Sequence, residues 1–330
     1  MTDPITLPEG YLVRPATLQD AAQIIEIIRL YDIAQQGESN QTVEDLLVEW
    51  QRPNFNLATD SWVILAPPTA DRPADLVVGY QELWNRHEHS ILSADGYVRP
   101  GYEGLGIGTT MLRLAEAEAL RQHVPAAPPG GRVFLRNGVD GSDPAAAQLH
   151  SNAGYQPSRY IWTMAIQLKS PPLPIQTWPA GVRLQDFRLG QDDRQVFETI
   201  DEAFQDHWGY TPMSYDLWRL RRLERQEFDA GLWFLAWDGD QIAGAALCEV
   251  REDVGWVNQL AVRRPWRRRG LGLALLQTAF ASFFQRGFTD VRLGVDAENP
   301  TGATQLYEKA GMHVYHRYIV FDKVLRDGIE

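Results

Sequence analysis

The sequence carries one pattern of short motifs twice, and this duplication restricts the chain to a fold built of two similar halves. The Gly-x-Gly pair at Gly106 and Gly108 lies 164 residues before the pair at Gly270 and Gly272. Two later matches follow in the same order, Ala153-Gly154 with Ala310-Gly311 and Arg159-Tyr160-Ile161 with Arg317-Tyr318-Ile319. A period of this length is far too long for a solenoid. The 330 residues also suit about two domains.

A proline-rich segment separates the two halves. Residues 169–181 contain four prolines, and proline disrupts both helix interiors and central strands. We therefore predict an N-terminal domain at 1–168, a linker at 169–181 and a C-terminal domain at 182–330.

Composition and charge exclude several classes of protein. Apolar residues make up 44% and aromatic residues 11% of the chain, which is enough for well-packed cores. The net charge of −12 disfavours nucleic acid and anionic membranes as partners and suits a cationic amine substrate. No apolar run reaches the ~18 residues of a membrane span, and the N-terminus lacks the pattern of a signal peptide. The single cysteine, Cys248, predicts a core thiol in a cytoplasmic protein.

Hydrophobic periodicity and turn residues predict a similar order of elements in both halves. Each half begins with a strand and two helices, continues through further strands into a Gly-x-Gly loop and a helix, and then returns to a strand. The first half has predicted strands at 11–15, 61–66, 76–83, 89–98, 132–135 and 160–168 and helices at 17–30, 42–50, 108–122 and 143–152. The second has strands at 182–187, 232–237, 242–250, 255–262 and 291–295 and helices at 191–204, 214–226 and 271–286.

A basic turn joins the strand 255–262 to the helix that begins at Leu271. Five of the seven residues from Arg263 to Arg269 are arginine. Free N–H groups and the positive end of the helix dipole face an anion at such a turn, and Gly270 allows close approach of the backbone. A nucleic-acid patch is the alternative, but the acidic chain as a whole offers no extended basic surface. We predict a phosphate site.

Two motifs in order resemble one superfamily. The turn Arg267-x-x-Gly270-x-Gly272 is similar to the acyl-CoA pyrophosphate loop of the GCN5-related N-acetyltransferases (GNATs). The downstream run from Asn299 through Tyr307 to Met312 resembles a later signature of the same superfamily. Together with the duplication, the resemblance covers almost the whole chain in a tandem form.

The resemblance implies an α/β (α+β) fold of two tandem GNAT-like domains, each a mixed, mostly antiparallel sheet flanked by helices with a splayed strand pair. It also implies transfer of an acetyl group from acetyl-CoA, as co-substrate and without a metal, to a primary amine, which we expect to belong to a small molecule. A non-catalytic acyl-CoA-binding sensor and a peptide or protein N-acetyltransferase are the alternatives. The chain would act as a monomer or a homodimer, with no nucleic-acid or membrane partner.

The resemblance assigns residues to the co-substrate. The backbone of Leu260, Ala261 and Val262 would bind pantetheine and polarise the thioester carbonyl. The pyrophosphate would be held by the loop and the start of its helix, that is by Arg267, Arg268, Arg269, Gly270, Leu271 and Gly272. Asn299 would bond pantetheine or only cap the following helix.

Tyr307 is the predicted general acid, because a positioned phenol can protonate the departing thiolate; the alternative is an aromatic residue that packs the helix. The base is less well marked. Many relatives carry a glutamate early in the strand before the loop, and the comparable position here is near Trp256. We predict Glu249, on the preceding strand, as the base, with a solvated hairpin carboxylate as the alternative.

Acceptor contacts are predicted in the aromatic and titratable segment that contains Asp206, His207 and Trp208. Asp206 would hold an ammonium group and Trp208 would stack on it, or the aromatic residues would only cover the core. In the N-terminal half, Glu103 stands where the other half has Arg267, and His150 stands where it has Tyr307. We therefore predict that the N-terminal domain does not catalyse and serves as a structural partner that shapes the acceptor cleft.

Overall fold

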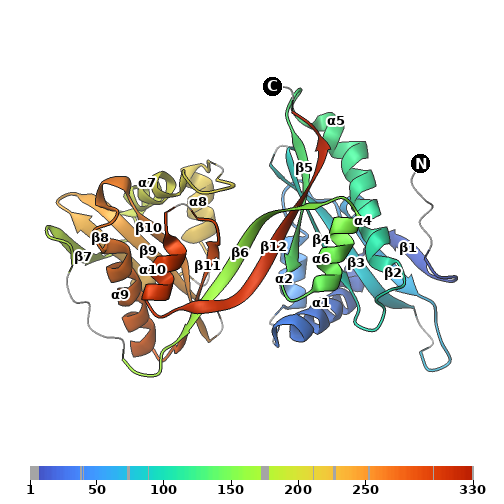
Figure 1. The fold of residues 1–330 in the computed structure, drawn as a ribbon, viewed down its shortest axis with the longest axis horizontal. Coiled ribbons are helices and arrows are strands. Elements are labelled where there is room, and N and C mark those ends of the chain that lie inside the picture. Colours follow the sequence, from blue (N-terminus) through green and yellow to red (C-terminus); the bar gives the residue numbers. More distant parts are fainter. Residues whose placement is uncertain are drawn as a thin grey trace. The chain divides into compact units, whose positions relative to one another are not determined.

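The computed structural model describes residues 7–37, 39, 41–72, 75–87, 89–171, 178–210, 212–225, 228–251, 253–299 and 301–328. The chain forms two compact units (Figure 1). The first runs to Tyr160 and also includes the stretch from Tyr318, and the second comprises residues 161–317. The middle of the predicted linker and the end of the predicted 214–226 helix lie outside the described residues.

The first unit is a mixed sheet with helices packed against it. Its strand order is β1-β2-β3-β4-β5-β12, and neighbouring strands are antiparallel except β4 and β5, which are parallel. The strands are β1 (Leu12–Pro15), β2 (Ser61–Ala66), β3 (Leu76–His87), β4 (Ile91–Val98), β5 (Val133–Asp140) and the last part of β12 (His313–Arg326). The α-helices are α1 (Ala21–Gln36), α2 (Val43–Glu49), α3 (Leu57–Asp60), α4 (Ile107–Glu118), α5 (Val124–Ala126) and α6 (Pro144–Asn152).

The second unit repeats this plan. Its strand order is β6-β11-β10-β9-β8-β7, with only β10 and β11 parallel among the described pairings. The strands are the last part of β6 (Gln156–Gln167), β7 (Val182–Asp186), β8 (Trp233–Asp238), β9 (Gln241–Arg251), β10 (Val254–Val262) and β11 (Asp290–Asp296). The α-helices are α7 (Asp193–Phe204), α8 (Tyr215–Arg222), α9 (Leu271–Gln285) and α10 (Ala303–Lys309). The predicted mixed, mostly antiparallel α/β architecture is confirmed.

The two halves of the sequence exchange their last strands. Residues Ile161–Gln167 of β6 pair with β11 in the second unit, and Tyr318–Arg326 of β12 pair with β5 in the first. Figure 1 shows β6 and β12 as the long strands that take part in this exchange. The boundaries predicted at 168 and 182 therefore differ from those of the compact units.

The sheet of the second unit is covered on both faces, because alternate residues of β9 enter different cores. Ala246 and Cys248 belong to the core that contains α9, whereas Ala245 and Leu247 belong to the core that contains α7 and α8. This period of two places successive side chains on opposite faces of the sheet. Cys248 is 2% exposed, which confirms the predicted core thiol, and burial raises the pKa of its thiol.

A gap opens between the parallel strands of each unit. In the second unit, β10 pairs with β11 only from Val254 to Trp256. A β-bulge then shifts the register of β10 against β9 between Val257 and Gln259. Bulges bend the strand that carries them, so the rest of β10 leaves β11. The expected splayed strand pair is present, and it positions the candidate site.

Candidate active site

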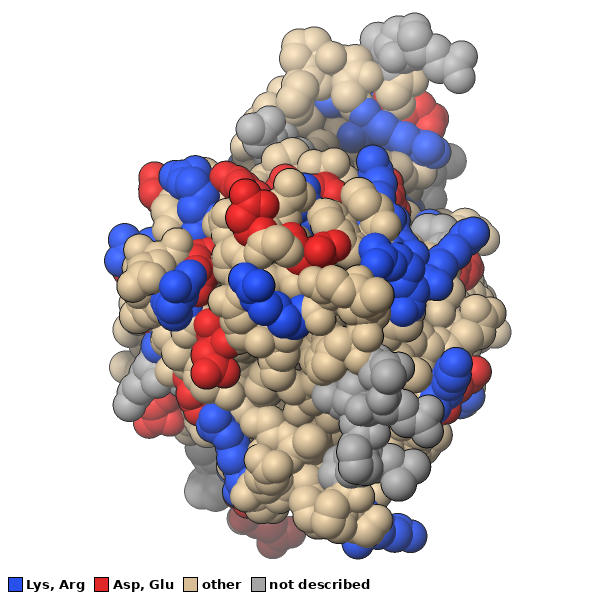
Figure 2. All heavy atoms as spheres, turned by 90° about the vertical axis from the view of Figure 1, so that its left-hand side faces the viewer, with Lys and Arg blue, Asp and Glu red and all other residues tan. Residues whose placement is uncertain are grey.

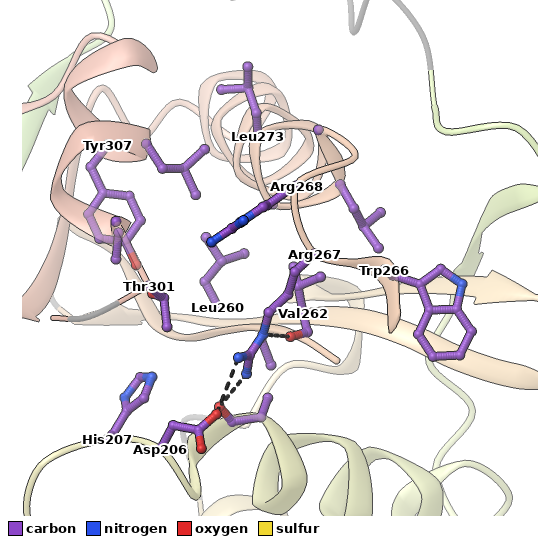
Figure 3. A pocket seen from close by; sticks show the side chains of 18 residues that line it. Asp206, His207, Leu260, Val262, Trp266, Arg267, Arg268, Leu273, Thr301 and Tyr307 are labelled. Carbon is purple, nitrogen blue, oxygen red and sulfur yellow. Dashed lines mark hydrogen bonds and ion pairs between the residues drawn. The ribbon is translucent and has the colours of Figure 1, made fainter. Parts of the chain in front are cut away.

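The candidate site is a cleft of about 500 Å³ beside the splayed end of β10. One wall is the end of β10, another is the loop and first turn of α9, and the others come from the end of α7 and the start of α10 (Figure 3). Its lining residues include the predicted general acid, Tyr307, and most of the residues predicted for the co-substrate, namely Leu260, Ala261, Val262, Arg267, Arg268, Gly270, Leu271 and Gly272.

The loop before α9 is shaped to present backbone N–H groups. Gly270 is the N-cap of α9 and has a φ of 84°, a left-handed conformation that glycine adopts without strain. Arg268 also has a positive φ, 61°, which is uncommon for a residue with a side chain. The first N–H groups of the helix have no partner within it. This geometry suits an anion at the start of α9.

The three loop arginines differ in what they contact. Arg267 donates to the carbonyl oxygens of Val262 (3.0 Å) and Ala203 (3.2 Å), so it ties the end of β10 to the end of α7. Arg269 donates to the carbonyl oxygen of Ala180 at 3.3 Å and does not line the cleft. Arg268 lines the cleft and lies in Figure 3 within the space also bordered by Tyr307. Of the three, Arg268 is the one placed to meet a phosphate.

Asn299 forms a local turn before α10 and does not cap that helix. Its Oδ1 accepts hydrogen bonds from the N–H (2.8 Å) and hydroxyl (2.5 Å) of Thr301. The residue does not line the cleft, and the N-cap of α10 is Gly302, with a φ of 77°. A local turn through Asn299 thus brings Thr301 and Gly302 into the cleft wall. Sequence reasoning missed these two residues, although they belong to the motif that it used.

Tyr307 lies on α10 and lines the cleft with only 8% of its surface exposed. Burial raises the pKa of its phenol to about 12, because a phenolate is poorly solvated in such a place. The side chain therefore keeps its proton at neutral pH. A protonated phenol in the wall of an anion-binding cleft can act as a proton donor.

Two of the three predicted acceptor contacts line the same cleft. Asp206 accepts hydrogen bonds from Arg264 (2.5 Å) and Arg267 (3.2 Å), and these lower the pKa of its carboxyl. Its charge is thus already compensated by two guanidinium groups. Burial, together with the positive charge of Arg267, lowers the pKa of the His207 imidazole. Trp208 is 36% exposed and does not line the cleft.

Glu249 lies outside this cleft. Its carboxylate accepts a hydrogen bond from Arg251 at 2.5 Å, and it lines a separate small notch together with Asn258. Burial opposes ionisation of Glu249, but hydrogen bonds from Asn258 and Arg251 outweigh burial and lower its pKa. Both features make Glu249 a weak and poorly placed base. Trp256, directly opposite Glu249 in the sheet, carries the Arg251 guanidinium over its ring at 4.6 Å.

Charge on the surface of the molecule is mixed. On the face in Figure 2, basic and acidic side chains alternate among other residues and do not merge into one large basic surface. The pair of Arg264 with Asp206 shows how the basic turn is partly neutralised. Within the described ranges, no helix combines the length and apolar character that crossing a membrane requires.

Comparison with known proteins explains this geometry. Residues 194–312 match the model of the acetyltransferase (GNAT) family. The mycothiol acetyltransferase of Catenulispora acidiphila is 31% identical over 77% of this chain and 79% of the relative. That of Geodermatophilus obscurus is 32% identical over 71% and 75%. The chain belongs to the GNAT family.

Solved GNAT structures agree over nearly the full length. The crystal structure of a GCN5-related N-acetyltransferase from Sphaerobacter thermophilus is 34% identical and has a TM-score of 0.83, with 98% of this chain and 99% of that one covered. A tandem GNAT protein from the clavulanic acid biosynthesis pathway has the same fold, with a TM-score of 0.71 at 16% identity over 97% and 100% of the two chains. The predicted resemblance to this superfamily in tandem form is confirmed, and the protein is an N-acetyltransferase of GNAT type.

The first GNAT unit keeps the shape of the loop and not its charge. Gly104 and Gly106, which match Arg268 and Gly270, have φ values of 76° and 77°. The carboxylate of Glu103 accepts a hydrogen bond from the N–H of Gly101 at 2.8 Å. An acidic side chain of the protein thus bonds to the backbone of this loop.

Proposed function

We propose that the second unit transfers the acetyl group of acetyl-CoA to a primary amine of a small molecule. The observation that carries this proposal is that Tyr307, Arg268 and the start of α9 line one cleft. The name of the relatives, mycothiol acetyltransferase, supports a small acceptor. A cleft of about 500 Å³ is also within the size range of small-ligand sites.

The residues present fit acetyl-CoA. The cleft follows the free edge of β10 as far as Val262, where the basic turn and the N-terminus of α9 begin. A Cβ at Gly270 would meet no atom within 4 Å, so open space lies over the loop. Arg268 and the first N–H groups of α9 would hold the diphosphate, and the backbone of Leu260 to Val262 would hold the pantetheine arm. When bound, acetyl-CoA supplies an activated acetyl group as a thioester.

The chain's own groups then handle protons and charge. N–H groups at the splayed end of β10 stabilise negative charge on the carbonyl oxygen. Tyr307 Oη donates a proton to the departing sulfur. His207 is a better proton acceptor than Glu249, because its imidazole lines the cleft and its lowered pKa keeps it neutral near pH 7. Asp206 holds Arg264 and Arg267 in place through its two ion pairs.

The first unit, in this proposal, does not catalyse. His150 replaces Tyr307 and is 7% exposed, and burial lowers the pKa of its imidazole. Its Nδ1 donates to the carbonyl oxygen of Ala146 at 2.8 Å, since a carbonyl can only accept. In the neutral ring Nε2 therefore carries no proton. His150 cannot supply the proton that Tyr307 supplies.

A Tyr307→Phe variant tests the proposal. We expect CoA release with a panel of small primary amines to fall about 10²–10⁴-fold, whereas the Kd for acetyl-CoA, measured by calorimetry, stays unchanged. If no amine gives CoA release with the natural chain although acetyl-CoA binds, the protein is an acyl-CoA sensor. If peptides with free N-termini are preferred over every small amine, the acceptor class proposed here is wrong.

A further inference from the structure

The first unit contains a cleft of its own that the proposed reaction does not use. The parallel pairing of β4 with β5 stops at Ser93 and Arg136. Beyond this point the strands separate, and a cleft of about 790 Å³ opens, with walls from β4, β5, α1, α4 and α6. It is larger than the cleft of about 500 Å³ in the second unit. A space of this size is typical of a small-molecule site.

The charge of this cleft is opposite to that of its counterpart. The cleft of the second unit includes Arg267 and Arg268. Among the described residues that line the first cleft, none is lysine or arginine, and Glu103 and Asp143 are both present. A polyanion such as CoA would meet repulsion here and no compensating cation. A cation would be attracted.

The carboxylate of Asp143 lines the cleft and can accept further hydrogen bonds. Asp143 accepts from the N–H of Ala146 (2.8 Å) and from the hydroxyl of Tyr31 (3.2 Å), which still leaves lone pairs on its two oxygens. Burial and the charge of Asp143 raise the pKa of Tyr31, so its phenol stays neutral. A ligand that contacts the Asp143 carboxylate would have to supply the donor.

Asn137 provides a second observation, separate from the carboxylates: its side-chain oxygen lacks a hydrogen-bond donor within the described part of the chain. It lines the cleft, is only 3% exposed, and its Oδ1 has no hydrogen-bond partner among the described residues. Buried polar atoms of this kind are rare and costly unless a ligand or water satisfies them. Gly138, the next residue of β5, also lines the cleft, and a Cβ there would meet nothing within 4 Å, so this position has room for a larger side chain.

The rest of the wall is apolar. Ile107, Met111 and Leu112 of α4 and Leu149 of α6 line the cleft. We propose that the cleft of the first unit binds a primary amine with an apolar body, as its ammonium ion, and does not bind acetyl-CoA. The ammonium group would lie near Asp143 and Glu103, a donor would reach Asn137, and the apolar body would lie against α4. This assigns the first unit a ligand and goes beyond a structural role.

Calorimetry on the full chain tests this inference with 2-phenylethylamine as the probe and 2-phenylethanol as its neutral counterpart. We expect the amine to bind more tightly than the alcohol. Asp143→Asn combined with Glu103→Gln should weaken amine binding about tenfold to a hundredfold. The asparagine can still accept the Ala146 N–H bond that begins α6. Gly138→Met, which adds a bulky side chain at a residue that lines the cleft, should weaken it as well.

Acetyl-CoA binding separates this inference from the proposed reaction. All three substitutions lie outside the second unit, so one molecule of acetyl-CoA should still bind per chain and turnover chemistry should persist. Equal binding of amine and alcohol, or amine binding that neither variant changes, would overturn the inference. Binding of a second molecule of acetyl-CoA per chain, if Gly138→Met abolished it, would also overturn the inference. If the natural chain transferred no acetyl group to any amine, that result would contradict only the proposed function and not this inference.

Discussion

At the scale of single residues, the site depends on which titratable groups share the cleft. Tyr307 and His207 line the same cleft, where burial raises the pKa of the phenol, so that it keeps its proton, and lowers the pKa of the imidazole, so that it is neutral near pH 7. The residue types near both positions were visible in the sequence. The family resemblance implied the role proposed for Tyr307, but no sequence signal marked His207 as a base, because the pKa of a side chain depends on burial and neighbours that are distant in the chain. Glu249 illustrates this, since Arg251 and Asn258 stabilise its charge and make it a weaker base.

The base can be identified from the pH dependence of kcat/KM. A histidine base is active when deprotonated, so the rate should rise as pH increases through the pKa of His207, which is lowered below 6.5. We expect His207→Gln to reduce kcat/KM about 10²–10⁴-fold and to remove this acid limb. Glu249→Gln serves as the matched control and should keep both the limb and most of the rate. The reverse pattern would restore Glu249 as the base.

At the scale of elements, local signals predicted helix starts well. The helix predicted at 42–50 forms as α2 and begins with a capping box, in which Thr42 Oγ1 accepts from the Asp45 N–H at 3.1 Å. Helix α9 begins at Leu271, as predicted, and Gly270 is its N-cap. Asn299 does not cap the following helix, which was one of its two predicted roles. Its side chain bonds to Thr301, and α10 starts only at Ala303. Competing local turns of this kind are equally compatible with the sequence.

The start of α9 gives a prediction with an internal control. Arg268→Ala should weaken acetyl-CoA binding about tenfold to a hundredfold, because it removes a charged donor from the cleft. Arg269→Ala removes the same charge from the same loop, but Arg269 faces the carbonyl of Ala180, so binding should change little. Calorimetric titration with acetyl-CoA at fixed salt compares them. Equal losses in both variants would mean that only the net charge of the loop matters.

At the scale of the whole molecule, the duplication predicted two similar units but not the exchange of their last strands. The segments 160–167 and 318–326 are both strands, and both are rich in apolar residues. Either could add to either sheet, so local sequence does not select its partner. The choice is made by long-range contacts. Arg136 of β5 donates to both carboxylate oxygens of Asp322 at 2.7 Å, and Lys323 Nζ donates to Glu116 of α4 at 2.7 Å.

The exchange makes the stability of the first unit depend on residues from the far end of the chain. Phe321 is 2% exposed and packs in the core that also contains Leu92, Leu135 and Tyr155. Phe321→Ala should cost about 3–5 kcal/mol, as is usual for a buried phenylalanine. Val324, on the same strand, is 39% exposed, so Val324→Ala should cost no more than about 0.5 kcal/mol.

Denaturant unfolding with hydrogen exchange localises this effect. We expect Phe321→Ala to expose amides of β4 and β5 while those of β9 and β10 stay protected, although residue 321 belongs to the C-terminal half of the sequence. If β9 and β10 lose protection instead, residues 318–326 support the second unit. In that case each half would fold with its own last strand, and the pairing of β12 with β5 would be wrong.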